Sequence, residues 1–156
     1  MIRTVKLDIR KGEYLSDALR RHGKENIPTR VILNKVLPGL GATYCEIMSP
    51  RSSIIIEPNV PVIVGKMEKH KNLLGIYRGV KTDEVARHIR KYPGCCKIMV
   101  TPESFRKVKQ AMEDEGVDMY KDFFMLFDEC EKIIQDNDFR ETIEAPLDDF
   151  FLSRQM

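Results

Sequence analysis

The stretch Met125-Leu126-Phe127-Asp128-Glu129-Cys130-Glu131 closes an apolar run, residues 123–127, with two adjacent acids. A run this short is typical of a buried strand rather than of a solvent-facing helix. The acids then lie at the carboxyl end of that strand, which is where open α/β sheets bind ligands. Carboxylates there can hold a metal ion, but acids also suit the first turn of a following helix. Both interpretations of Asp128 and Glu129 stay open on this stretch alone.

Upstream of this stretch, apolar runs alternate with helical patterns. We expect strands in residues 4–9 (or an extended arm there), 30–37, 53–57, 74–77, 97–101 and 123–127. We expect helices in residues 12–21, 60–69, 82–91, 102–115 and 130–135. Strands that alternate with helices at this spacing predict a mainly parallel sheet with right-handed crossovers. The fold class that follows is α/β, with three layers.

The composition is that of an ordinary globular chain. The 156 residues are enough for one core, and 42% hydrophobic with 32% charged residues is a common mixture. The net charge of +2 is too small to indicate a nucleic-acid partner by itself. No apolar run approaches the length of a membrane span, so we expect no membrane partner.

Cysteine usage indicates a reducing compartment. The four cysteines, Cys45, Cys95, Cys96 and Cys130, contain no C-x-x-C pair, and their spacing suits neither a zinc site nor a disulfide framework. Reduced thiols in or near a core are the plain interpretation, and they predict a cytoplasmic protein.

Two further features stand at predicted strand ends. The glycine loop Gly39-Leu40-Gly41-Ala42-Thr43 lies between a predicted strand and the helix we expect after it. Backbone N–H groups of such a loop can cradle phosphate oxygens, and the Thr43 hydroxyl is placed where it would ligate Mg²⁺. The pair Thr101-Pro102 ends a strand and opens a helix, a geometry that suits a nucleic-acid phosphate. An ordinary turn and an ordinary helix cap are the alternatives.

The order of these motifs resembles the first RecA-like domain of a DEAD/DEAH-box type helicase, over about residues 30–131. Gly39, Gly41 and Thr43 match the Walker A motif, and Asp128-Glu129, followed by Cys130-Glu131, match Walker B. The segment Ile54-Ile55-Ile56-Glu57-Pro58-Asn59 is similar to the next strand-and-turn motif of the family. Gly79 stands where the family has a glycine turn, and Thr101-Pro102 match another motif that contacts the nucleic-acid backbone.

The resemblance implies ATP and Mg²⁺ as cofactors and DNA or RNA as a partner. It places nucleotide on Gly39, Leu40, Gly41, Ala42 and Thr43. It places Mg²⁺ on Thr43 and Asp128, and catalysis on Asp128 and Glu129. It places nucleic acid on Pro58, Asn59, Gly79, Thr101 and Pro102. It also implies a second RecA-like domain or a protein partner.

Two departures from the family bear on activity. The Walker A lysine falls at position 42, where this chain has Ala42, and the arginine expected shortly after Pro58 is missing. That lysine neutralises phosphate charge, so hydrolysis should be impaired. In the family a further strand lies between the Walker A and Walker B strands and follows Walker B in sequence. We expect residues 1–29 to form an arm or strand with a short helix. We expect residues 30–156 to form a RecA-like domain that is truncated, because no segment after Walker B matches this further strand.

Three functions follow as alternatives. The first is a nucleic-acid-dependent NTPase domain that works only with a partner domain. The second is a non-hydrolysing relative that binds nucleic acid or a protein, and Ala42 favours it. The third is an α/β domain unrelated to helicases that binds a small molecule, or more generally a non-catalytic binding or protein-interaction module. A basic cluster, Lys66, Lys69, His70 and Lys71, could follow a phosphate backbone, although such runs are more often solvated helix faces.

Overall fold

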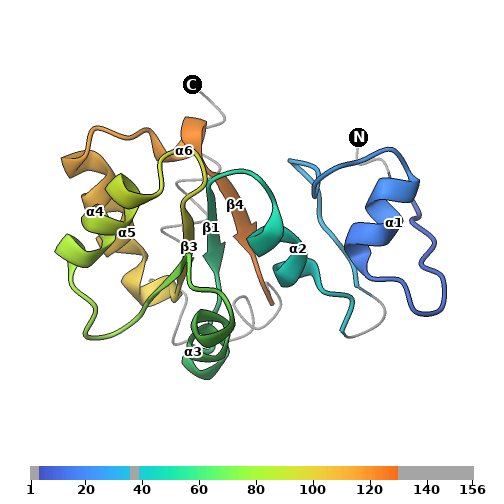
Figure 1. The fold of residues 1–156 in the computed structure, drawn as a ribbon, viewed down its shortest axis with the longest axis horizontal. Helices are drawn as coiled ribbons and strands as arrows, with labels where there is room; N and C mark the ends of the chain where they lie inside the picture. Colours follow the sequence, from blue (N-terminus) through green and yellow to red (C-terminus); the bar gives the residue numbers. More distant parts are fainter. Residues whose placement is uncertain (1–3, 36–38, 130–156) are drawn as a thin grey trace. The chain divides into compact units, whose positions relative to one another are not determined.

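The computed structural model describes residues 4–35 and 39–129 (Figure 1). The chain divides into two compact units, Met1–Ser49 and Pro50–Met156, and we describe each by itself. The division falls after Ser49, whereas the sequence suggested a division after residue 29. The helix expected over residues 130–135 lies outside the described residues.

The first unit contains two short helices that contact each other, α1 (Leu15–Arg21) and α2 (Ala42–Met48). The helix expected over residues 12–21 is confirmed, with its start moved to Leu15. Leu15 donates its backbone N–H to the Leu40 carbonyl over 2.8 Å, so the glycine loop supplies an acceptor to the first turn of α1. The buried apolar residues of this unit are Leu15, Ala18, Leu19, Ile27, Ala42, Cys45 and Ile47.

The strand predicted for residues 30–37 is wrong over its described part. Residues 30–35 form no strand, and Ile32 is 94% exposed. Residues 4–9 form no strand either, which leaves only the extended-arm alternative. A strand needs a neighbour that takes up its N–H and C=O groups. No other strand is present among the described residues of this unit, so an apolar run alone does not become one.

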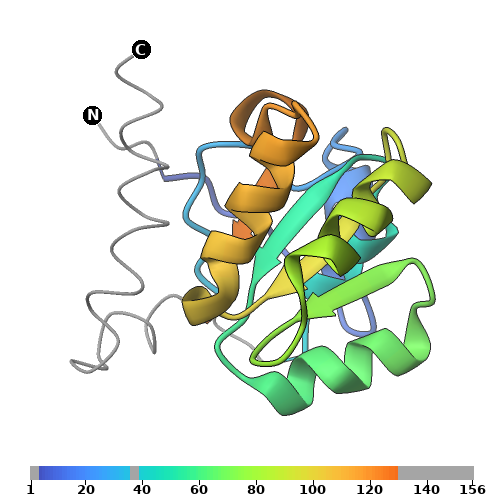
Figure 2. The same cartoon turned by 90° about the vertical axis from the view of Figure 1, so that its left-hand side faces the viewer.

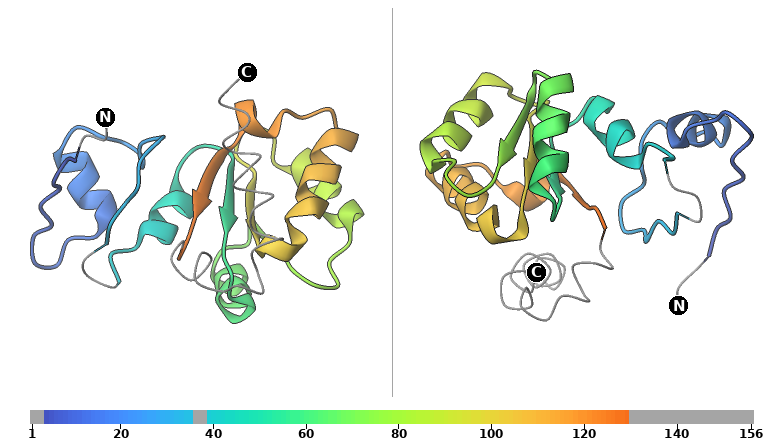
Figure 3. Two further views of the ribbon diagram at one scale, coloured as in Figure 1. Left: turned by 180° about the vertical axis from the view of Figure 1, so that it is seen from behind. Right: turned by 90° about the horizontal axis from the view of Figure 1, so that it is seen from below.

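The second unit is a four-stranded parallel sheet (Figures 1 and 3), and helices connect its strands along the chain. The strands are β1 (Ser53–Ile56), β2 (Leu73–Ile76), β3 (Lys97–Val100) and β4 (Phe124–Phe127). The helices are α3 (Val60–Lys69), α4 (Thr82–Lys91), the 3₁₀ turn η1 (Pro102–Ser104), α5 (Phe105–Asp114) and α6 (Met119–Asp122). The strand order is β2-β3-β1-β4.

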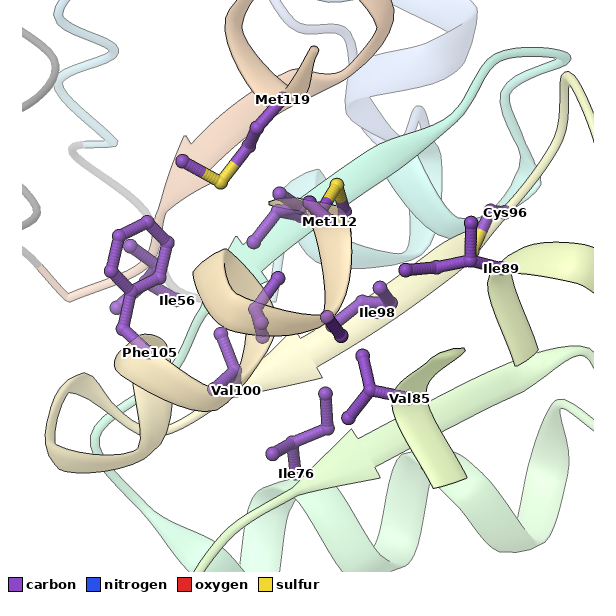
Figure 4. Packing of buried hydrophobic residues seen from close by; sticks show 13 residues of the cluster. Ile56, Ile76, Val85, Ile89, Cys96, Ile98, Val100, Phe105, Met112 and Met119 are labelled. Carbon is purple, nitrogen blue, oxygen red and sulfur yellow. The ribbon is translucent and has the colours of Figure 1, made fainter. Parts of the chain in front are cut away.

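Helices α4 and α5 cover one face of this sheet, and Figure 2 shows both in front of the strands. Alternate strand residues such as Ile54, Ile56, Ile98 and Val100 point to this face, as period-two geometry requires. They meet Val85 and Ile89 of α4, and Phe105, Val108, Ala111 and Met112 of α5 (Figure 4). This cluster is the main hydrophobic core of the unit.

Helix α3 lies on the other face, against β2. A Cβ atom built on Gly75 would stand 2.5 Å from Ile63 Cγ2 and 2.3 Å from Met67 Sδ, both side chains of α3. Gly75 alternates with Leu74 and Ile76, which belong to the opposite face, so α3 and the pair α4–α5 sandwich the sheet. Glycine suits this position because the side chains of Ile63 and Met67 occupy the space that a Cβ atom would take.

The predicted fold class is therefore confirmed: the protein is α/β, with a parallel sheet between helices, an arrangement shared by RecA-like and other Rossmann-like domains. The strands predicted near residues 53–57, 74–77, 97–101 and 123–127 form within a residue of their expected positions, and α3 and α4 have the predicted bounds. Over the described ranges, no helix has both the length and the apolar character that crossing a bilayer requires.

Candidate functional site at the carboxyl edge of the sheet

The four strands end in a single row. Ile56 of β1 pairs with Val100 of β3 and with Phe127 of β4, and Val100 pairs with Ile76 of β2. The residues that follow these strands therefore emerge side by side at one edge. Parallel α/β sheets bind ligands at this edge, because the loops that leave it diverge and open a crevice.

Glu57 follows β1 directly and is 1% exposed. Its backbone N–H donates to the Val100 carbonyl over 3.0 Å, which continues the sheet pairing by one residue. The carboxylate Oε1 accepts the Asn59 backbone N–H at 2.9 Å. The sequence-based site did not include Glu57, although an acid directly after the run Ile54-Ile55-Ile56 carries the same signal that drew attention to Asp128.

Asn59 connects the ends of β1 and β4. Its side-chain Nδ2 donates to Glu57 Oε1 and to Glu129 Oε2, each over 3.0 Å. Asn59 is the N-cap residue of α3, where an asparagine side chain usually accepts a backbone N–H from the first turn. Here no such capping bond forms, and the amide is directed at two carboxylates instead. The residue thereby sets the positions of acids from two strands.

Asp128 and Glu129 lie where the sequence placed them, at the end of β4. The Asp128 N–H donates to the Ile56 carbonyl over 2.9 Å, and Asp128 Oδ1 accepts the Glu129 N–H at 3.0 Å. Glu129 has a φ of 52°, a left-handed conformation that is uncommon outside glycine. Such strain often marks a functional turn, and here it turns the exposed Glu129 side chain toward Asn59.

Burial raises the pKa of the Glu57 carboxyl from 4.5 to about 7. The Asn59 backbone hydrogen bond opposes this rise, while the side-chain hydrogen bond to Asp128 and the charges of Asp128 and Glu129 add to it. Burial and the neighbouring acids both disfavour the negative charge of Glu57, so the protonated form of this carboxyl is favoured up to near neutral pH. The edge thus contains one buried carboxyl group, that of Glu57, which can accept or release a proton in the physiological range.

The residues matched to nucleic-acid motifs also lie along this edge. Gly79, three residues after β2, is exposed with a φ of 96°, and Pro58 is half-buried beside Asn59. Thr101 is buried, and its N–H donates to the Ile76 carbonyl over 3.1 Å. Pro102 is buried as well. The side chains of Thr101 and Pro102 therefore support the turn after β3 and do not face solvent.

The glycine loop belongs to the first unit. Gly39 and Gly41 have φ values of 75° and 74°, a left-handed conformation that glycine tolerates best. Ala42 and Thr43 stand in the first turn of α2, a helix of seven residues, and the Ala42 side chain is 6% exposed. The expectation that a sheet strand precedes this loop is wrong, as residues 30–35 show. The sequence pattern predicted that this strand and the strand ending at Phe127 would bring the glycine loop and the acids to one edge of a parallel sheet, and residues 30–35 do not form such a strand.

The acids at the edge suit a magnesium site in which the protein supplies only some of the ligands. Within residues 4–35 and 39–129, no three carboxylate, histidine or cysteine groups are arranged to hold a metal ion. A metal cage made by the protein alone is thus not present in that part of the chain. Mg²⁺ is more often bound by one or two carboxylates together with substrate phosphates and water, and Asp128 suits that mode.

Two other buried charged residues were not singled out from the sequence. Glu46 in α2 is buried, and its Oε1 accepts a hydrogen bond from the Ser49 hydroxyl over 3.0 Å. Lys97 in β3 is buried, and its Nζ donates to the Ser53 hydroxyl over 2.9 Å. No periodic pattern marks these positions, because each side chain sits where an apolar residue would be expected.

Comparisons of the chain with family models, with curated proteins and with solved structures gave no match.

Proposed function

We propose that this protein is a helicase-like domain that binds nucleotide and nucleic acid and hydrolyses ATP poorly or not at all. The observation that carries the proposal is the row of strand ends. Asn59, Gly79, Thr101 and Asp128, each matched to a different motif of the family, follow four strands whose ends are in register. A parallel sheet brings whatever follows its strands to one edge, so the support lies in each matched motif standing at or shortly after a strand end, as the family pattern requires.

In this proposal the acids of the edge serve the nucleotide. Asp128 would hold Mg²⁺, together with the phosphates of a bound nucleotide. Glu129 positions the water that would attack the terminal phosphate. Asn59 holds Glu129 in place through its 3.0 Å hydrogen bond. Bound Mg²⁺ would supply charge neutralisation at the phosphates.

Ala42 accounts for the weak hydrolysis in this proposal. Without a lysine on the β- and γ-phosphates, one of the main charge-neutralising contacts of phosphoryl transfer is lost, a loss that typically costs a few kcal/mol of barrier. The carboxylates at the sheet edge do not depend on residue 42, so the Mg²⁺-dependent part of nucleotide binding would remain.

Titration with a fluorescent ATP analogue, with and without Mg²⁺, tests the proposal. We expect weak binding that requires Mg²⁺ and is lost in Asp128→Asn. Asp122→Asn is the matched control, because Asp122 ends α6 on the exposed surface and the change in charge is the same. Binding that does not depend on Mg²⁺ would contradict the assigned role of Asp128. An equal loss of affinity in Asp122→Asn and Asp128→Asn would also contradict it.

An ATPase assay with and without added DNA or RNA tests the second half of the proposal. We expect no measurable turnover from the isolated chain under either condition. Robust turnover that Glu129→Gln abolishes would make the protein a working NTPase instead.

A further inference from the structure

We infer that the outer face of α3 binds the acidic and aromatic segment of the same chain at residues 141–152. The inference goes beyond the proposed function and does not depend on it. The segment lies outside the described residues. What identifies it as the occupant is its sequence, together with the place where the described part of the chain ends.

The first two turns of α3 expose apolar side chains. Val60, Val62 and Val64 are 37%, 40% and 37% exposed, whereas Ile63 is fully buried. Valine is a poor helix former, because its branched Cβ loses rotamer freedom in a helix. Exposed valines therefore favour neither the helix nor its contact with water. A segment that covers them would remove apolar surface from solvent, which is favourable.

The last turn of α3 adds positive charge to this surface. Lys66 and Lys69 stand in that turn, and Lys71 follows shortly after the helix. None of these three lysines forms an ion pair with an acid of the described chain. Burial and then the charges of Lys66 and Lys69 lower the pKa of His70, which reflects the same positive potential. Because Val62, Lys66 and Lys69 are four and seven residues apart, they form one stripe along the helix.

Residues 141–152 have the complementary character. These twelve residues contain four acids and five large apolar side chains, and they contain no lysine or arginine. Asp148 and Asp149 directly precede Phe150 and Phe151, so one short stretch combines negative charge with apolar surface. The α3 stripe combines positive charge with apolar surface over a similar length, and the two therefore match in both properties.

The described chain ends beside the start of α3. Glu129 Oε2 accepts a hydrogen bond from Asn59 Nδ2 over 3.0 Å, and Asn59 is the N-cap residue of α3. Residues 130–140 link this point to the segment, and eleven residues span up to about 36 Å when extended. A ten-residue helix such as α3 is about 15 Å long, so the segment can reach both of its ends. Tethering gives an effective concentration on the order of millimolar, so weak contacts are enough.

Photo-cross-linking of the full chain tests the inference. With p-benzoylphenylalanine in place of Phe151, we expect a cross-link within one chain, located in residues 60–71 by mass spectrometry of the digested protein. The same group in place of Tyr120, an exposed aromatic residue of α6, is the control and should not label α3. No cross-link from position 151, or one that maps elsewhere in the chain, overturns the inference. A cross-link between two chains overturns the choice of occupant in favour of a second copy.

Charge reversal separates a specific contact from chance proximity. In Lys69→Glu/Lys71→Glu the yield of the cross-link should fall about threefold or more, because two attractions become repulsions. Both side chains are exposed, so the fold should be kept, and far-UV circular dichroism checks this. Asp148→Lys/Asp149→Lys should lower the yield as much, and combining the two double variants should restore it. A yield that neither double variant lowers overturns the inference.

The matched control is Arg106→Glu/Lys121→Glu, which makes the same change in charge at exposed residues of α5 and α6. An unchanged yield in this control supports the inference. A loss equal to that of Lys69→Glu/Lys71→Glu overturns it, since the total charge of the chain would then be responsible. Glu68 is an exposed acid of α3 that opposes an acidic segment, so Glu68→Gln should raise the yield. A lower yield in Glu68→Gln would count against the inference.

Discussion

The runs Val31-Ile32-Leu33 and Ile54-Ile55-Ile56 have nearly the same sequence character and opposite fates. The second run is a central strand in which every residue is at most 1% exposed. The first is not a strand, and Ile32 is 94% exposed. Both are short and rich in β-branched residues, so propensity and hydrophobicity do not separate them.

The difference lies in the partners that each run finds. Strand β1 has β3 on one side and β4 on the other, so its backbone groups are satisfied and its side chains are covered on both faces. Residues 31–33 lie in a unit whose described part contains two helices and no strand with which they could pair. An apolar run therefore forms a strand only where neighbouring strands can pair with it, and the run by itself indicates only the tendency to do so.

Replacing a residue in the middle of β1 should have the largest effect on this comparison. Ile55→Thr removes buried methyl groups and buries a hydroxyl, and Ile55 is fully buried in the sheet. We expect a loss of about 2–4 kcal/mol in the free energy of unfolding, measured by urea denaturation. A loss below about 1 kcal/mol would mean that β1 is not the tightly packed centre that its burial indicates.

The acid that follows β1 should make stability depend on pH. The pKa of Glu57 is raised from 4.5 to about 7, so the native state prefers the protonated carboxyl. Its contribution to stability is greatest below pH 4.5 and is lost as pH rises through about 7. Glu57→Gln imitates the protonated form and should be more stable than the parent by up to about 3 kcal/mol at pH 8.

Urea denaturation of the parent and of Glu57→Gln at several pH values measures this difference. The stability gain should shrink toward zero as pH falls to 4.5, the usual pKa of the group. Glu103→Gln serves as the control, because Glu103 is exposed and leaves the sheet untouched. A gain that stays the same across the series would mean that the pKa of Glu57 is not raised in the folded protein.

The face of the sheet opposite the main core can be probed at Gly75. In Gly75→Ala the new methyl group meets Ile63 and Met67 of α3, and we expect a loss of about 1–3 kcal/mol. Gly65→Ala is the control on α3 itself. A Cβ there meets nothing within 4 Å, so helix propensity should give a gain of about 0.5–1 kcal/mol. The same sign for both variants would mean that α3 does not press on β2.

Much of the second unit could be predicted because its signals are local. Pro61 near the start of α3, Gly116 after α5 and the apolar strand cores each act over a few residues, and they fixed element positions to within a residue or so. Pro102 opens η1 in the same way.

The arrangement of the candidate site could not be predicted in the same way. The hydrogen bond between Asn59 and Glu129 joins residues 70 positions apart, and the raised pKa of Glu57 depends on burial and on which strands are neighbours. The sequence located Asp128 and Glu129, and Glu57 carries the same local signal of an acid after an apolar run, but its burial beside Asp128 cannot be read from that signal. The strand order that creates this contact is a tertiary property.

The smallest expected effect is the most direct test of the comparison. Ile32→Thr makes the same chemical change as Ile55→Thr, but at a side chain that is 94% exposed. Exposed substitutions without special contacts usually change stability by less than about 0.5 kcal/mol, so the urea midpoint should hardly move. A loss as large as that of Ile55→Thr would mean that residues 31–33 form a buried strand in solution, as their sequence alone suggests. The matched pair thus separates the intrinsic tendency of an apolar run from the partners that make it a strand.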